Sequence, residues 1–130
     1  MEKEFLFYSL HSGYSPDGNR VKFKIKDENT LELEFSYYSN NRKSSNYSIN
    51  LKSSEEDLEN KIRDLFKDSE TNYDDIYFFR TDIYIFNAIK KLARKPMSKI
   101  IVGDFFENLE NIFEKQRENT YFEYEQIRKP

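Results

Sequence analysis

The chain has 130 residues, a formal net charge of −3 and no cysteine, which excludes disulfides, thiolate nucleophiles and cysteine metal sites. Its length suits one domain with one hydrophobic core, so we expect a single globular domain over residues 1–130. No apolar run reaches the roughly 18 residues that a membrane helix needs, and the amino terminus lacks a signal-peptide pattern, so we expect a cytoplasmic protein without membrane contact.

The composition predicts a core built from large rings, because hydrophobic residues make up only 37% of the chain while aromatic residues reach 17%. The first apolar and aromatic run, residues 4–10, predicts a strand at the start of the chain. Turn-forming residues fill 12–19 and predict a loop directly after it.

Two further strands are predicted at 21–25 and 31–35, where apolar residues alternate with charged ones in the period-two pattern of a half-buried strand. A three-residue turn at 27–29 joins them as an antiparallel hairpin, with Asn29 in the left-handed conformation that asparagine tolerates. This turn determines the register of the whole hairpin. The predicted partners are Val21 with Phe35, Lys22 with Glu34, Phe23 with Leu33, Lys24 with Glu32, and Ile25 with Leu31.

The next segment predicts a fourth strand followed by a first helix. Apolar residues alternate again over 47–51, as in a strand with one buried face. Ser53 or Ser54 then provides an N-cap, and acids fill the first helical turn, where the positive end of the helix dipole favours carboxylates. The apolar residues that follow recur at helical spacing and predict one buried stripe, made of Leu58, Ile62, Leu65 and Phe66.

Two more helices are predicted in the second half of the chain. Thr81 and Asp82 provide the cap of a helix that runs to about Arg94, and Asp104 begins another after Gly103. Both helices carry apolar residues at helical spacing. The predicted inward residues are Ile83, Phe86, Ile89 and Ala93 in the former, and Phe105, Leu109, Ile112 and Phe113 in the latter.

The end of the chain predicts a closing strand at 120–125, because Thr120, Phe122 and Tyr124 alternate with the residues between them. The apolar runs 76–79 and 99–102 are too short for periodicity to choose between strand and helix. Together these elements predict an α+β fold, in which a mainly antiparallel sheet of about five strands packs against about three helices. The predicted order is roughly β-β-β-β-α-α-α-β.

The side chains that most enzymes require are missing. A single histidine, His11, excludes sites with two imidazoles, and the three glycines form neither a dinucleotide-binding nor a phosphate-binding motif. We therefore expect no catalytic residues, no metal and no cofactor. The alternative is a metal-dependent hydrolase built on carboxylates, although charged runs are more typical of solvated faces. The carboxylate pairs available to it are Asp74 and Asp75, Glu32 and Glu34, and Glu123 and Glu125.

Charge is segregated along the second half of the chain. Residues 53–77 hold nine acids and three bases, residues 80–99 hold one acid and six bases, and residues 103–126 hold seven acids and two bases. The bases near the end of the second predicted helix suit the negative end of its dipole, and the flanking acidic segments can neutralise them. We therefore do not expect this basic segment to bind nucleic acid.

The acidic segments and the ten tyrosines favour a different function, the binding of a basic protein, because complementary charge steers association and tyrosine is enriched at binding hot spots. The leading hypothesis is a non-enzymatic inhibitor of the kind represented by bacterial immunity proteins, which neutralise a co-encoded, nuclease-type toxin by direct contact. The predicted partner-binding residues are Glu55, Glu56, Asp57, Asp64, Tyr73, Asp74, Asp75, Tyr77, Glu107 and Glu110.

The alternative function comes from the basic segment, whose cations can contact phosphates. On that hypothesis the chain is a nucleic-acid-binding protein, or a phage-encoded regulator or inhibitor, that uses residues 90–99. The sequence alone does not separate an immunity protein from a phage inhibitor of a host enzyme, since both need only a compact domain with a complementary surface.

Overall fold

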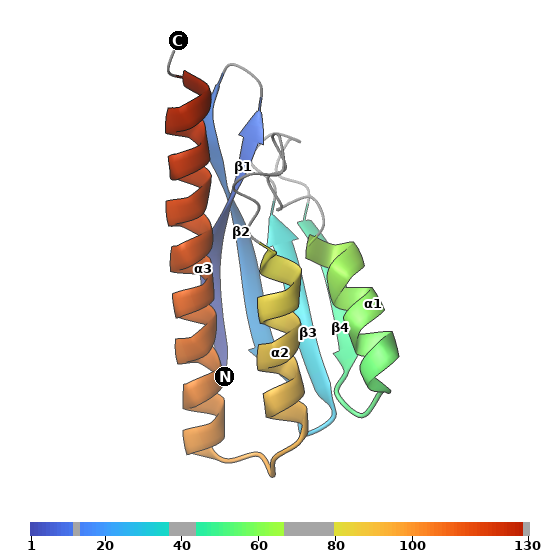
Figure 1. The fold of residues 1–130 in the computed structure, drawn as a ribbon. Helices are drawn as coiled ribbons and strands as arrows, with labels where there is room; N and C mark the ends of the chain where they lie inside the picture. The colour runs from blue at the N-terminus through green and yellow to red at the C-terminus, as the bar shows by residue number, and fades with distance from the viewer. Residues whose placement is uncertain (12–13, 37–43, 67–79, 129–130) are drawn as a thin grey trace.

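The computed structural model describes residues 1–11, 14–36, 44–66 and 80–128, which form one layer of sheet and one layer of helices (Figure 1). The four strands pair antiparallel in chain order, and three helices follow, so the predicted α+β class is confirmed. The elements are β1 (Glu2–His11), β2 (Tyr14–Ile25), β3 (Thr30–Ser36), β4 (Ser44–Asn50), α1 (Glu55–Phe66), α2 (Thr81–Ala93) and α3 (Lys99–Arg128).

The hairpin of β2 and β3 has the predicted register at every pair, from Val21 opposite Phe35 to Ile25 opposite Leu31. Its turn is held by Asp27, whose carboxylate accepts a hydrogen bond from the Asn29 amide at 2.8 Å. Such local bonds from Asp to the backbone two residues on stabilise turns. The period-two pattern therefore decides which side chains face the helices.

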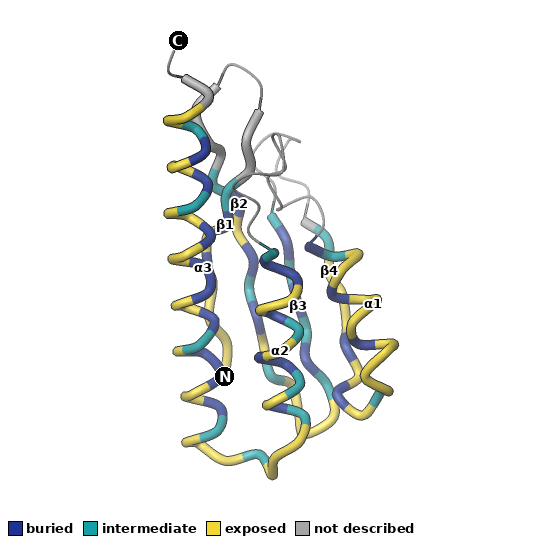
Figure 2. The backbone as a smooth tube through the Cα atoms, viewed as in Figure 1, coloured by how far each residue is buried: buried dark blue, intermediate teal, exposed yellow. Residues whose placement is uncertain are grey.

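The core lies between the sheet and the helices, where both layers turn their buried residues (Figure 2). Phe23 of β2 is fully buried at its centre, with ring centroids of Phe5, Phe66, Phe105 and Phe113 within 5.8–6.3 Å. These rings come from β1, α1 and α3, and most meet Phe23 edge to face or tilted, as aromatic quadrupoles prefer. The expectation of rings in place of many aliphatic residues is only partly right, because eight of the 22 buried hydrophobic residues described are phenylalanines and fourteen are aliphatic.

The first helix matches its predicted pattern. The Ser54 hydroxyl accepts a hydrogen bond from the Asp57 amide at 3.2 Å, so Ser54 provides the N-cap. Leu58, Ile62 and Phe66 are buried and Leu65 is half-buried. The apolar stripe therefore faces the core, and the remaining residues of α1 face solvent.

The second helix is present, but its predicted cap and inward face are partly wrong. Arg80 occupies the N-cap position without a side-chain cap bond, and Thr81 and Asp82 lie buried inside the first turn. Ile89 is buried as expected, whereas Ile83 is 42% exposed. Apolar residues occupy a broad arc of this helix, so the neighbouring helices rather than periodicity select its inner face. That face consists of Ile85, Ala88, Ile89 and Leu92, with Phe86 and Ala93 half-buried.

The predicted closing strand is wrong, because residues 120–125 continue α3 to Arg128. The described residues form four strands, near the predicted number of about five. Thr120 and Glu123 are buried, and Phe122 is 46% exposed, which is the helical pattern and not the alternating one. The segment 99–102, ambiguous in the sequence, begins the same helix after Ser98, whose hydroxyl accepts a bond from the Ile101 amide. The inward residues predicted for 104–113 are all buried.

Candidate protein-binding surface

The outer surface of α1 carries the predicted acids. Glu55, Glu56, Asp57 and Asp64 are all exposed, because the apolar stripe of this helix is turned to the core. Glu56, Asp57 and Asp64 lie on the side of the helix opposite that stripe, at the spacing that places residues on one helical face. We call these three residues the α1 acidic face.

Cations of the described residues do not neutralise the α1 acidic face. Within the ranges that the structure describes, none of its three carboxylates forms an ion pair. Glu55, by contrast, is paired with Arg94 of α2.

The two cations of α1 point elsewhere. Arg63 pairs with Glu59 at 2.9 Å and approaches the buried Asp82 carboxylate at 4.0 Å, on the side toward α2. Lys61 donates to the Ser48 carbonyl of β4 at 2.6 Å. Neither cation of α1 therefore pairs with the α1 acidic face.

The predicted acids of α3 lie apart from those of α1. Contacts join α1 to α2 and α2 to α3, so α2 separates the two acidic helices within the layer (Figure 1). Glu107 and Glu110 are exposed on α3, and Glu110 is paired with Lys3 at 2.7 Å. The structure therefore does not unite the predicted residues into one contact. Four of them lie outside the described residues, namely Tyr73, Asp74, Asp75 and Tyr77.

The basic segment is partly neutralised, as expected from its acidic neighbours. Arg94 is bound to Glu55, and the Arg80 guanidinium donates two hydrogen bonds to Asp82, at 3.0 and 2.8 Å. Lys90 lies 5.3 Å from the Phe86 ring centroid, within the range of a cation–π contact. Three of the six cations of this segment, Arg80, Lys90 and Arg94, therefore contact other residues of the domain.

Two lysines of the segment remain at a groove between α2 and α3. Lys91 and Lys95 line this groove of about 290 Å³ together with Asp104 and Asn108 of α3. Neither lysine forms an ion pair with a residue in the described part of the chain. This groove is the basic surface available to an anionic ligand, and a carboxylate lies in its wall.

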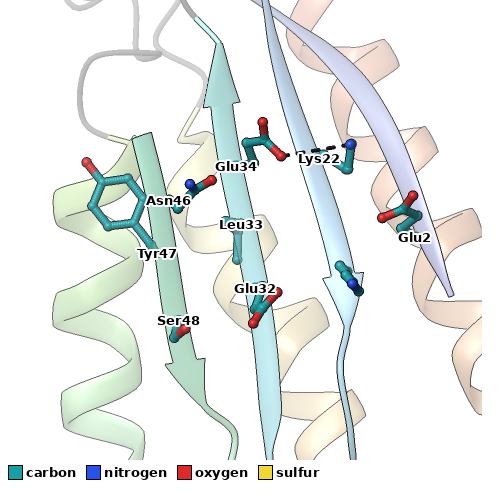
Figure 3. A pocket seen from close by; sticks show the side chains of 9 residues that line it. Glu2, Lys22, Glu32, Leu33, Glu34, Asn46, Tyr47 and Ser48 are labelled. Carbon is teal, nitrogen blue, oxygen red and sulfur yellow. Dashed lines mark ion pairs between the residues drawn. The ribbon is translucent and has the colours of Figure 1, made fainter. Parts of the chain in front are cut away.

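The outer face of the sheet, away from the helices, is a balanced polar surface. It holds a shallow hollow of about 480 Å³, lined by side chains such as Glu32, Glu34 and Asn46 (Figure 3). Ion pairs of 3.6–3.8 Å run across the strands there, from Lys22 to Glu34 and from Lys26 to Glu32. The Lys22–Glu34 pair joins residues that the register places opposite each other, whereas Glu32 pairs with Lys26 and not with its register partner Lys24. These pairs reduce the net charge that this face offers a partner.

Exposed tyrosines come from three different elements. Tyr84 of α2 is 49% exposed, Tyr121 of α3 is 39% exposed, and Tyr47 of β4 is 37% exposed. Tyr47 belongs to the alternating segment that predicts the fourth strand. It is exposed because β4 is the last strand of the sheet, which the alternation pattern does not reveal.

One titratable group outside the acidic surface has a shifted pKa. A hydrogen bond with the Tyr8 side chain, and then the charge of Glu114, raise the pKa of the exposed Arg117 guanidinium above its ordinary value. Because an arginine is ordinarily protonated throughout the physiological pH range, this shift does not change its charge there.

Among the residues that the structure describes, no three histidine, cysteine or acidic side chains are grouped so that they could hold a metal ion. In the same part of the chain, no helix is both long and apolar enough to cross a membrane. Comparisons with protein-family models, with curated proteins and with solved structures gave no match.

Proposed function

We propose that this chain is a non-enzymatic binding protein that recognises a basic protein partner through the α1 acidic face. The observation that carries the proposal is a set of three exposed carboxylates that form no ion pair with the described residues, while the two cations of α1 are bound elsewhere. A surface of one sign accelerates encounter with a surface of the opposite sign and disfavours partners of like charge.

The particular form that we propose is an inhibitor that acts in the cytoplasm. It neutralises a basic, nuclease-type toxin by direct contact, in the manner of bacterial immunity proteins. Nucleases that bind phosphate backbones carry clustered cations, and those cations are the natural complement of acids arranged on one helix. Tyr84 and Tyr47 supply exposed ring area of the kind enriched at hot spots.

The test is affinity capture from lysate of the organism that carries the gene, with three forms of the tagged protein. The first is the unmodified chain, the second carries E56Q, D57N and D64N, and the third carries D104N, E107Q and E118Q. Both triple variants lose three exposed acids, so they have the same net charge. We expect one basic protein to be captured by the first and third forms and lost with the second.

Equal capture by all three forms would show that the α1 acidic face is not the binding surface. Loss with both triple variants would show a dependence on net charge alone. Circular dichroism of each variant verifies that the fold is retained.

A second candidate function, nucleic-acid binding, is favoured by Lys91 and Lys95 at the groove between α2 and α3. Asp104 in the wall of the groove and the acids along α3 argue against nucleic-acid binding, because carboxylates repel phosphates. Filter binding of DNA and RNA at several salt concentrations separates the two functions. Phosphate contacts give an affinity that falls steeply with salt and that K91Q with K95Q abolishes.

A further inference from the structure

The outer edge of β4 is the structural feature beside the α1 acidic face. Among the described residues β4 is the last strand of the sheet, and its backbone pairs with β3 on one side only. In an antiparallel ladder the backbone groups of alternate residues point away from the paired strand. The Ser48 carbonyl accepts a hydrogen bond from Lys61 of α1, so Ser48 points outward, and Asn46 follows by the same alternation.

Within the described residues, Lys61 of α1 is the one protective group found at this edge. Natural proteins place charges, proline or a covering element on edge strands to prevent further pairing. β4 contains no charged residue and no proline, although 35% of the chain is charged. The lysine from α1 occupies one carbonyl of its outer edge.

The opposite edge of the sheet is protected. β1 carries charged side chains at Glu2, Lys3 and Glu4. Further along β1, the Gln116 carboxamide occupies both outward backbone groups of Tyr8, at 2.9 and 2.7 Å. Within the described residues, the contrast between the two edges of the sheet indicates β4 as the edge open to a further strand.

We propose that β4 accepts an extended segment of the basic partner as a fifth strand, so that main-chain hydrogen bonds and the α1 acidic face act on the same protein. This inference rests on the proposed function. Lys61 lies four residues after Asp57 and three before Asp64, which places the two acids on the side of α1 that reaches the β4 edge. A lysine or arginine on the incoming strand would thus meet carboxylates beside its backbone partners.

Tyr47 adds a contact for the same strand. Its ring lies beside β4, on the side away from β3, and it packs edge to face on Phe35 with centroids 5.7 Å apart (Figure 3). The ring is held from within the core and open on its outer side, so a side chain of the added strand can cover it without displacing it.

The charges argue for a basic partner rather than a second copy of this chain. Pairing β4 with β4 of another copy needs two-fold symmetry, which brings each α1 toward its own counterpart. α1 holds five acids and two bases, so its two copies would repel each other. The acidic side chains of α1 would instead attract a cationic strand.

The test is an NMR titration of isotope-labelled protein with a capped heptapeptide of alternating lysine and valine, at low ionic strength. We expect the amide signals of Asn46 and Ser48 to shift and to gain protection from hydrogen exchange. A heptapeptide of alternating glutamate and valine, used as the control ligand, should leave them unchanged.

Two variants of one position make the test specific to the strand edge. N46P removes an outward N–H while leaving the ladder to β3 intact, and N46A keeps that N–H. We expect N46P to weaken binding of the lysine–valine peptide by at least about tenfold, the effect of losing one to two backbone hydrogen bonds, and N46A to bind normally. Heteronuclear correlation spectra verify that both variants fold.

Equal binding by N46P and N46A, or shifts that leave Asn46 and Ser48 unaffected, would overturn the strand addition. If the free protein dimerises and N46P abolishes the dimer, the β4 edge binds a second copy of the chain. That outcome also overturns the proposed addition of a partner strand. The lysate capture distinguishes the failure of this inference from failure of the proposed function. If N46P still captures the basic protein that the α1 triple variant loses, the proposed function stands without strand addition.

Discussion

Gln116 shows how one polar side chain is accommodated in a core of rings. It is 2% exposed, and its carboxamide accepts a hydrogen bond from the Tyr8 amide and donates one to the Tyr8 carbonyl. It also donates to the Thr120 hydroxyl at 3.2 Å, and that hydroxyl donates to the Gln116 carbonyl at 2.7 Å. The Gln116 side chain thereby bonds the Tyr8 backbone as the peptide group of a neighbouring strand would. These bonds join α3 to the edge of β1.

Substitution of Gln116 by alanine should lower the free energy of unfolding by about 1–3 kcal/mol, because it leaves the Tyr8 amide and carbonyl without their partner in a partly buried site. Urea denaturation measures the change. Q126A removes the same side chain from an exposed position of α3 and should change stability by less than about 0.5 kcal/mol. Equal effects of the two substitutions would contradict the role assigned to Gln116.

At the level of elements, α3 is the helix that the sequence predicted least completely. The alternation at 120–125 is short, and these residues continue the helix, with Thr120 and Glu123 buried on the same side as Gln116. The position of Gly103 within the first turns of the helix also obscured its start at Lys99. Glycine disfavours a helix locally, and contacts with α2 and β1 override that preference.

Gly103 has no packing reason to be glycine, since a Cβ atom built there meets nothing within 4 Å. Substitution by alanine should raise the free energy of unfolding by about 0.5–1 kcal/mol, because alanine loses less backbone entropy in a helix. Thermal and urea unfolding measure this gain.

Gly18 provides the comparison, because an added Cβ there would lie 3.3 Å from the Tyr8 ring, which packs on Tyr121. G18A should therefore show no comparable gain. A loss of stability in G103A would mean that this glycine serves a contact absent from the described part of the chain.

At the level of the whole molecule, sheet and helices share one core. Phe66 of α1 packs on Phe23 of β2 and Phe35 of β3, and Phe113 of α3 contacts Phe5 of β1. No layer can be removed without exposing rings that belong to the other, so the layers should unfold together.

We therefore expect one cooperative thermal transition, as the prediction of a single domain over residues 1–130 requires. Differential scanning calorimetry should give a ratio of calorimetric to van 't Hoff enthalpy of about one. Two resolved transitions, or a ratio well above one, would show that part of the chain unfolds independently and would contradict the single domain.

The sequence by itself determined the properties that depend on local periodicity. Alternation specified the β2–β3 register, and helical spacing specified the buried stripe of α1 and hence the exposure of Glu56, Asp57 and Asp64. Each of these follows from one segment and its nearest neighbour, because side-chain direction repeats with a fixed period in strands and helices.

Only the tertiary structure decided which elements become neighbours. It placed α2 between the two acidic helices, turned Ile83 of α2 outward, and left β4 at an edge with Tyr47 exposed. These outcomes depend on contacts between segments that are distant in the chain. Local patterns carry no information about which side of a strand or helix remains without a partner, and that is the property from which the proposed binding surface arises.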